Sequence, residues 1–315
     1  MNISTPIAEV NRAKLHTALA DGHCIGLPTE TVYGLAADAT NGIAVARIFE
    51  MKGRPKFNPL ICHVSDVEMA RKYGQFNDLA EKLAETFWPG PLTLVLPVVP
   101  GSGLHPLVTA ELGTVGLRCP KGVAAEIIAE FGKPLAAPSA NRSGRVSPTT
   151  AKHVAEEFGS DLLVADMGPC EVGLESTIIK VEGNTMRLLR PGAITAEAIE
   201  TVTGIAPETS ASDKIEAPGM MKSHYAPNAR IKLECSTFEA GAAVLGFGEV
   251  PNPPDAFFNL SASGNLREAA SNLYAGLKML DDLGVETICV MSIPAYGLGV
   301  AINDRLQRAA APRDT

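Results

Sequence analysis

Short apolar runs alternate with stretches of helical periodicity through roughly the first two hundred residues of the chain. Gly, Pro or polar residues bound each run, which is the pattern of short buried strands. The predicted strands are Cys24–Leu27, Leu60–Val64, Leu92–Val99, Val115–Cys119, Leu135–Ala137, Leu162–Ala165, Thr177–Val181 and Arg187–Leu189.

The segments between these runs predict helices. The first is expected at Pro6–Ala20, because Thr5 can cap it, Pro6 suits its first position and Gly22 follows its end. Further helices are predicted at Gly42–Met51, Asp78–Phe87, Val123–Phe131 and Pro148–Phe158. The alternation of strands and helices predicts an α/β domain that reaches to about residue 203.

The pattern changes in IAPETSASDKIEAPGMMKSHYAPNAR, between Ile205 and Arg230. Three prolines, small polar residues and little apolar period are typical of a linker, and long loops are often functional. A second α/β pattern follows, with strands predicted at Ala243–Phe247, Ala256–Leu260 and Thr287–Ile293, and helices at Leu266–Leu283 and Val300–Ala310. The predicted organisation is a domain over 1–204, a linker over 205–230 and a smaller domain over 231–315.

Composition narrows the class of protein. The 315 residues are 46% hydrophobic, which supports real cores and excludes a disordered chain. A formal net charge of −8 argues against a broad basic face for duplex nucleic acid, although a local basic pocket remains open. Six cysteines without a CxxC pair favour buried, reduced thiols over a zinc site.

The sequence also bears on the compartment. The polar N-terminus does not predict a signal peptide. The longest uncharged stretch near the C-terminus, Thr287–Asn303, is too short and too broken by Pro294 to span a bilayer. We expect a cytoplasmic protein without a membrane partner.

A basic loop is the first candidate for chemistry, since the GxxxxGK[ST], GxGxxG, HExxH and GxSxG motifs are all absent. The run KGRPKFNP, from Lys52 to Pro59, places three cations within five residues. Closely spaced Lys and Arg on a stiff loop suit a polyphosphate. By composition alone, a solvated basic loop at a helix C-terminus is the simpler interpretation.

A second candidate is the hydroxyl- and amide-rich turn from Pro138 to Thr149. It follows a predicted strand, and Ser147 is expected to cap a helix that begins at Pro148, where exposed amides could bind an anion. An ordinary Ser cap with a polar turn is slightly favoured in isolation. The motifs PTETVYGL, GLESTI and RPG likewise put polar groups at strand ends, where α/β folds present ligands, but each alone is more typical of a turn.

Taken together, the ordered motifs PTETVYGL, KGRPKFNPL, PSANRSG, SPT, GLESTI, RPG and HYAP resemble the threonylcarbamoyl-AMP synthase family in its long two-domain form. The resemblance covers residues 1–230, and the remainder matches by position and pattern. It implies a YrdC-like twisted mixed-sheet domain, then a linker lying over the active site, then a smaller Rossmann-like α/β domain.

The resemblance also implies a reaction. L-threonine, bicarbonate or CO2 and ATP, with Mg²⁺ accompanying the ATP, would give threonylcarbamoyl-AMP and pyrophosphate, so the enzyme would be a nucleotidyltransferase. A downstream tRNA threonylcarbamoyl transferase would then modify the adenosine next to the anticodon. tRNA would therefore be involved only indirectly.

Carried over by motif, the resemblance assigns two sets of side chains and no metal ligand. The nucleotide set is Lys52, Arg54, Asn58, Thr114, Ser139, Asn141, Ser147, Arg190 and Tyr225, of which Lys52 and Arg54 would be catalytic through positioning and charge stabilisation. The L-threonine set is Thr31, His63, Arg118 and Ser176. Arg118 suits a carboxylate, whereas His63 alone would be interpreted as a core histidine.

The substrates imply the mechanism. Neutral threonine amine attacks CO2 or bicarbonate, and the resulting N-carboxylate attacks the α-phosphorus of ATP in line, so no side-chain nucleophile is needed. Lys52 and Arg54 are expected to lie outside any core. The linker, through Tyr225, is expected to cover the nucleotide and exclude water; the alternative is that Tyr225 only docks the two domains.

Two other functions remain open at this point. A double-stranded-RNA-binding YrdC-like protein would need a basic concave surface, which the acidic balance and the lack of aromatics near the basic loop disfavour. A carbamoyl-adenylate enzyme of a related domain type would carry zinc-finger cysteines, which the spacing does not provide.

Overall fold

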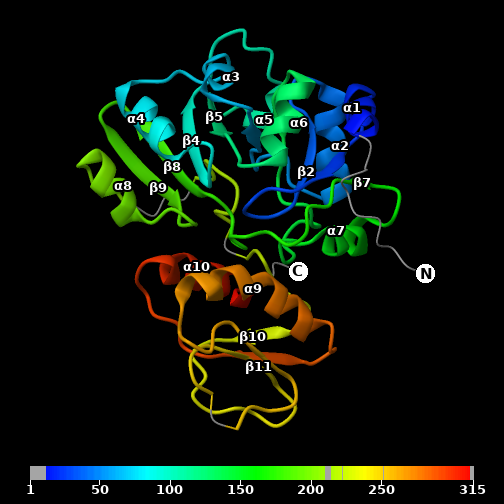
Figure 1. Cartoon of the computed structure of the whole chain (residues 1–315), viewed down its shortest axis with the longest axis vertical. Coiled ribbons are helices and arrows are strands. Elements are labelled where there is room, and N and C mark those ends of the chain that lie inside the picture. Colours follow the sequence, from blue (N-terminus) through cyan, green and yellow to red (C-terminus); the bar gives the residue numbers. More distant parts are fainter. Residues whose placement is uncertain (1–11, 210–213, 222, 251, 313–315) are drawn as a thin grey trace.

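The computed structural model describes residues 12–209, 214–221, 223–250 and 252–312. Two α/β bodies lie one above the other along the long axis of the molecule (Figure 1). The larger is built on a nine-stranded mixed sheet and the smaller on a four-stranded parallel sheet. The predicted two-domain α/β class is therefore confirmed, while the boundaries at 204 and 230 stay predictions.

The nine-stranded sheet has the order β7-β1-β2-β6-β3-β5-β4-β8-β9. Parallel and antiparallel pairs are mixed within it, as in β3 with β5 and β4 with β5. Its strands are β1 (Ile25–Leu27), β2 (Gly34–Asp38), β3 (Ile61–His63), β4 (Leu92–Pro97), β5 (Thr114–Arg118), β6 (Leu135–Ala136), β7 (Leu163–Val164), β8 (Thr177–Glu182) and β9 (Thr185–Arg190).

Eight helices accompany this sheet in the described residues. They are α1 (Arg12–Ala20), α2 (Gly42–Lys52), α3 (Val67–Arg71), α4 (Asp78–Phe87), α5 (Pro106–Thr109), α6 (Val123–Phe131), α7 (Ala151–Phe158) and α8 (Ala196–Thr203). α4 and α6 have the predicted bounds, and residues 6–11 of the predicted first helix lie outside the described residues.

The start of α7 differs from the prediction. Thr150, not Ser147, is the N-cap, and its hydroxyl accepts from the backbone amide of His153. The Ser-Pro pair is typical of a cap followed by a first helical turn, yet here the hydroxyl of Ser147 donates instead to the carboxylate of Glu175. The expectation of a helix beginning at Pro148 was wrong, and with it the expected helix-terminal anion site.

The smaller body has the strand order β10-β13-β11-β12. Its strands are β10 (Arg230–Lys232), β11 (Ala243–Gly246), β12 (Phe257–Asn259) and β13 (Thr287–Val290), and its helices are α9 (Leu266–Asp281) and α10 (Leu298–Ala310). Figure 1 shows α9 and α10 on the side of this sheet that faces the larger body. The two helices therefore form the contact surface between the domains.

The segment between the domains packs on both. Ala217 is buried with Ile61, Val95 and Ile178 of the large sheet, while Tyr225 is buried in the core that α9 and α10 form. The segment thus crosses the large sheet before it enters the second domain. No helix among the described residues has the length and apolarity that a membrane crossing needs.

Candidate active site

Strand ends, loops and the inter-domain segment meet around one cavity of about 50 Å³. Eight of the predicted site residues line it: Thr31, Arg54, His63, Arg118, Ser139, Ser176, Arg190 and Tyr225. They come from motifs spread over most of the large domain and the linker. The fold therefore brings the whole predicted L-threonine set and four residues of the predicted nucleotide set to one place.

Arg118, at the end of β5, is paired with a carboxylate that the sequence analysis did not single out. Its Nη2 lies 2.9 Å from Oε1 of Glu30, and both side chains are buried. Its Nη1 donates to Oγ1 of Thr31 at 2.8 Å, and its Nε donates to the carbonyl of Gly90 at 3.3 Å. We call Glu30, Thr31 and Arg118 the Arg118 cluster; its paired charges sum to zero.

His63, at the end of β3, lies beside this cluster. Burial and the charge of Arg118 lower the pKa of His63 to about 3, so its imidazole is neutral at pH 7. Its Nδ1 is buried without a hydrogen-bond partner in the described part of the chain. A neutral ring with an unpartnered nitrogen can hydrogen-bond a polar ligand without adding charge.

Lys52 is buried, which contradicts the expectation that it lies outside a core. Its Nζ donates to the carbonyls of Ser139 (2.6 Å) and Asn141. Burial and nearby Arg54 lower the pKa of Lys52. It thus supports the loop that carries Ser139 and is not itself among the residues that line the cavity.

Arg54 is also buried, again against expectation, because the loop folds back over it. Its Nε donates to the carbonyl of Asn58, and its Nη2 donates to Oδ1 of Asn58 and to the carbonyl of Pro59. Burial lowers the pKa of Arg54 to about 9, so it stays charged at neutral pH. Asn58 therefore orients Arg54 in this structure.

Arg190, at the end of β9, connects the site to the linker. It donates to the carbonyl and the hydroxyl of Ser176 at 2.9 and 3.2 Å, and to the carbonyl of Pro218 at 3.3 Å. Gly219 follows with φ of +83°, and a Cβ there would lie 2.9 Å from Arg190 and 2.7 Å from the hydroxyl of Tyr225. Only glycine fits this approach of the linker.

We call Lys52, Arg54 and Arg190 the Arg54 cluster. In contrast to Arg118, each of its cations hydrogen-bonds only to neutral carbonyl, amide or hydroxyl oxygens among the described residues. No carboxylate among the described residues hydrogen-bonds to these cations, which favours an anionic ligand.

Tyr225 lies where either role that the sequence left open would place it. It lines the cavity, and its ring stacks on Tyr274 of α9 with centroids 5.7 Å apart. Its backbone has φ of +62°, an unusual conformation for a non-glycine residue that is often found at functional sites. Its hydroxyl is buried without a hydrogen-bond partner among the described residues.

Three other predicted nucleotide residues lie away from the cavity lining. Asn141 donates to two carbonyls of its own loop, and its Oδ1 is unpartnered. Ser147 donates to Glu175 at 2.6 Å. Thr114 lies at the opposite end of β5 from Arg118. Their nucleotide contacts stay predictions.

Unpartnered polar atoms concentrate at this site. Within the described part of the chain, six buried side-chain atoms lack a hydrogen bond, and they belong to Glu30, His63, Arg118, Asn141, His224 and Tyr225. Four of these residues line the cavity, Glu30 pairs with one of them, and Asn141 is held by Lys52. Oε1 of Glu30 and Nη2 of Arg118 form the ion pair described above. The other four atoms are costly unless a ligand or water satisfies them.

Comparison with known proteins extends over both domains. Residues 17–192 match the Sua5_yciO_yrdC family model, described as "Telomere recombination", and residues 194–311 match the model "Threonylcarbamoyl-AMP synthase, C-terminal domain". The chain is 38% identical to a threonylcarbamoyl-AMP synthase of Bacillus subtilis (96% of this chain, 93% of the relative) and 39% identical to one of Pyrococcus abyssi (94% and 92%).

A solved structure agrees with these matches. The crystal structure of P. abyssi Sua5 complexed with L-threonine superposes with a TM-score of 0.86 at 37% identity, over 96% of this chain and 95% of that one. The resemblance that the motifs indicated is confirmed. The names of these relatives support it over the RNA-binding and carbamoyl-adenylate alternatives.

Proposed function

Because the chain belongs to the threonylcarbamoyl-AMP synthase family, we propose that it is an L-threonylcarbamoyladenylate synthase. As a nucleotidyltransferase, it would convert L-threonine, bicarbonate or CO2 and ATP into threonylcarbamoyl-AMP and pyrophosphate. The product would supply a tRNA threonylcarbamoyl transferase, and tRNA would be the eventual acceptor. The single observation that carries the proposal is one cavity with a charge-neutral Arg118 cluster and a cationic Arg54 cluster.

The Arg118 cluster suits threonine, which is a zwitterion. Nη2 of Arg118 carries two N–H groups and pairs with Glu30 alone among the described residues, so one N–H remains for the amino acid's carboxylate. His63 Nδ1 and the hydroxyl of Ser176 can accept from or donate to the amine and hydroxyl. Because His63 is neutral, it adds no charge beside the amine. The amine would lose its proton to solvent before its nitrogen forms the bond to the carbon donor.

The Arg54 cluster suits the phosphates of ATP. Arg54 and Arg190 line the cavity and stabilise the charge that develops as pyrophosphate leaves, and Lys52 holds the Ser139 loop in place. We propose that Mg²⁺ enters on the ATP phosphates. Glu175, the sole acidic residue in the described lining, already pairs with Arg305, and the described residues contain no group of three or more His, Cys, Asp or Glu arranged to hold a metal.

The cavity is small for these substrates. Its volume of about 50 Å³ is well below the roughly 300–1,000 Å³ of ligand pockets. We propose that the linker, including Pro218, Gly219 and Tyr225, moves to admit ATP and then covers the adenylate. Closure would exclude water, because an acyl-adenylate hydrolyses when exposed.

Substrate dependence tests the proposal. Pyrophosphate release from ATP should require both threonine and bicarbonate, and mass spectrometry should find threonylcarbamoyl-AMP. A pocket that contacts the threonine methyl should favour threonine over serine by about 10–200-fold. Equal release without an amino acid would refute the function, and salt-dependent binding of double-stranded RNA with no such turnover would favour the RNA-binding alternative.

A further inference from the structure

The second domain reaches the cavity through one buried arginine. Arg305 of α10 is 0% exposed. Its Nε lies 2.8 Å from Oε2 of Glu175, its Nη2 donates to the carbonyl of Pro191 at 2.9 Å, and its guanidinium carbon lies 5.2 Å from the ring centroid of Tyr225. Glu175 and Tyr225 line the cavity, and Pro191 follows Arg190.

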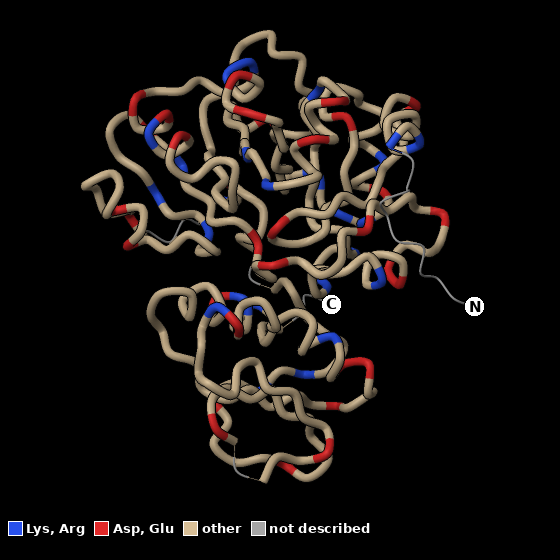
Figure 2. The backbone as a smooth tube through the Cα atoms, viewed as in Figure 1, with Lys and Arg blue, Asp and Glu red and all other residues tan. Residues whose placement is uncertain are grey.

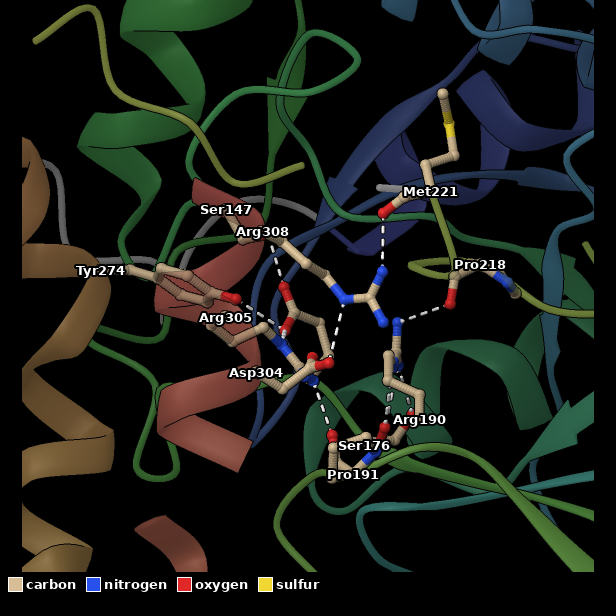
Figure 3. Close-up of polar contacts among 11 residues, drawn as sticks. Ser147, Ser176, Arg190, Pro191, Pro218, Met221, Tyr274, Asp304, Arg305 and Arg308 are labelled. Carbon is tan, nitrogen blue, oxygen red and sulfur yellow. Dashed lines mark hydrogen bonds and ion pairs between the residues drawn. The ribbon is translucent and has the colours of Figure 1, made fainter. Parts of the chain in front are cut away.

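Two further side chains of the second domain hold this arrangement. Tyr274 of α9 donates its hydroxyl to Oε2 of Glu175 at 2.8 Å, and its ring stacks on Tyr225. Asp304 accepts from Nη1 of Arg305 at 2.6 Å. Figure 3 shows Arg305 contacting Pro191, which follows β9, close to Ser176 and Arg190, with Asp304 and Tyr274 nearby.

The other carboxylate oxygen of Glu175 contacts a residue of the predicted nucleotide set. Oε1 accepts from the hydroxyl of Ser147 at 2.6 Å. On the far side of Pro191, Arg190 holds Ser176 and the linker carbonyl of Pro218. Each polar contact of Arg305 with the first domain is therefore one residue or one hydrogen bond away from a predicted substrate contact.

We propose that Arg305, assisted by Tyr274, is a positioning residue through which the second domain sets the geometry of the nucleotide site. By fixing Glu175, Pro191 and the ring of Tyr225, it holds Ser147, Arg190 and Tyr225 in their binding orientations. This inference rests on the proposed function, because it assumes that these three residues contact ATP.

The chemistry of the interface favours positioning over simple adhesion. Apolar side chains of α9 and α10 already bury a core against Val32 and Leu174 of the first domain. A buried ion pair is often no more stabilising than apolar residues of the same volume, because both charges lose their hydration. What the pair adds is a fixed direction for a carboxylate, a carbonyl and an aromatic ring.

The charged groups around Glu175 predict in which direction nucleotide binding should change with pH when Arg305 is removed. Burial alone would raise the pKa of Glu175, but the charges of Arg305 and Arg190, with hydrogen bonds from Ser147 and Arg305, lower it to about 2. Tyr225, Tyr274 and His224 also face it. Without Arg305, an ionised Glu175 would act on Arg190 and repel phosphate, and protonation at lower pH would relieve both effects.

The test uses the full chain with Arg305→Met, and calorimetry of Mg²⁺ and a non-hydrolysable ATP analogue far below the unfolding temperature. We expect the Kd to rise by roughly 10–150-fold at pH 7.5, the effect of losing one charge-assisted contact between Arg190 and phosphate, and to recover partly as the pH falls to 6. The double variant Glu175→Gln with Arg305→Met should bind tighter than Arg305→Met and lose the new pH dependence.

Lys278→Met is the matched control. Lys278 pairs with Glu156 at 3.0 Å across the same domain interface but does not touch Glu175, so its loss should leave the Kd within twofold. If Arg305→Met lowers the unfolding temperature but keeps the wild-type Kd, the pair is only structural and the inference is wrong. If Arg305→Met does not fold, Tyr274→Phe replaces it, and an unchanged Kd there also refutes the inference.

The two proposals can fail separately. A wild-type protein that binds the analogue but makes no threonylcarbamoyl-AMP would refute the proposed function, while the Kd series would still decide whether Arg305 positions a nucleotide site. In an active enzyme, positioning predicts a larger rise in the KM for ATP than for threonine. Equal changes in both would indicate a general loosening of the fold and would count against the inference.

Discussion

The two groups of buried cations at the candidate active site differ in what they are paired with. Arg118 is matched by the carboxylate of Glu30, 2.9 Å away, whereas Lys52, Arg54 and Arg190 have only neutral oxygens as partners. One site therefore presents a charge-balanced pocket beside a strongly positive one. The difference matches a zwitterionic amino acid beside a polyphosphate.

The unbalanced cluster costs the empty protein stability. Burying cations without counter-charges is unfavourable, and burial lowers the pKa of Lys52, Arg54 and Arg190. A bound polyphosphate would remove that cost, so its binding energy would include relief of the repulsion. Acidic overall composition does not conflict with this, because Figure 2 shows Lys and Arg interspersed with Asp and Glu over both domains.

The largest effect should come from unbalancing the Arg118 cluster. Glu30→Gln leaves a buried guanidinium without its counter-charge, which should lower the free energy of unfolding by about 3–5 kcal/mol. Urea unfolding at pH 7 measures this. Glu30→Gln should also make inorganic phosphate a competitive inhibitor with respect to threonine, because the Arg118 cluster would gain a net positive charge.

The double variant Glu30→Gln with Arg118→Met is the control for this prediction. Since removing both charges leaves neither uncompensated, it should be more stable than Glu30→Gln alone. A single variant as stable as wild type would show that the pairing of charges is not what distinguishes the two clusters.

The next effect comes from the Arg54 cluster. Arg54→Ala should weaken ATP turnover by roughly 1.5–3 kcal/mol, as expected for one charge-assisted contact, and should not impair threonine binding comparably. Steady-state kinetics give both KM values. Lys56→Ala is the matched control, because Lys56 is the nearby cation of the same loop and no hydrogen bond or ion pair is described for it; equal losses in both variants would make the loop a diffuse basic surface.

The sequence predicted the residues that line the cavity better than the hydrogen bonds and ion pairs that hold them. Motifs located eight lining residues, and apolar runs located all the strands of the large sheet except β2. β2 reads GLAAD, without β-branched or aromatic residues, so its propensity is low and its pairing with β1 and β6 defines it. β10 has three residues and is likewise defined by its partner strand.

Partners of buried charges could not be predicted locally. Glu175 and Arg305 are 130 positions apart in the chain, and nothing near either residue indicates the other. The same is true of Ser147, whose Ser-Pro context indicated a helix cap while its hydroxyl binds a distant carboxylate. The available signal was Glu175 in the GLESTI motif, next to an apolar strand. A carboxylate that is buried at such a place needs a partner.

The third effect is a dependence of stability on pH, with one histidine beside each cluster. Burial and Arg118 lower the pKa of His63 to about 3. Burial also lowers the pKa of His224 to about 3; the charge of Glu175 opposes this, and Arg54, Lys52 and Arg190 add to it. Both folded-state values lie below the ordinary 6.5. Stability from these groups is therefore complete above pH 6.5 and is lost as the pH falls toward 3.

Each histidine should account for about 2 kcal/mol of the loss between pH 7 and pH 5. Urea unfolding at the two values measures it, and His63→Asn or His224→Asn should each remove its share. Arg54→Ala distinguishes the two histidines. It should reduce the loss of unfolding free energy due to His224 and leave the loss due to His63 unchanged. Equal reduction of both shares would mean that burial alone sets the two pKa values.

The smallest effect concerns the linker over the Arg54 cluster. Glu216 of the linker pairs with Arg187 of β9 at 2.9 Å and with Lys180 of β8, and these are partly exposed ion pairs worth about 0.2–1 kcal/mol. Glu216→Gln removes both pairs and should thus raise the open fraction of the linker by at most about thirtyfold. The AMP formed per threonylcarbamoyl-AMP recovered should rise by no more than that factor, because water reaches the adenylate only when the linker opens.

Glu182→Gln is the matched control for Glu216→Gln. Glu182 pairs with the same Lys180 and Arg187 but belongs to β8, so its substitution removes the same kind of charge without releasing the linker. A rise in AMP with Glu182→Gln as large as with Glu216→Gln would mean that the charge of Lys180 and Arg187, and not their hold on the linker, controls hydrolysis.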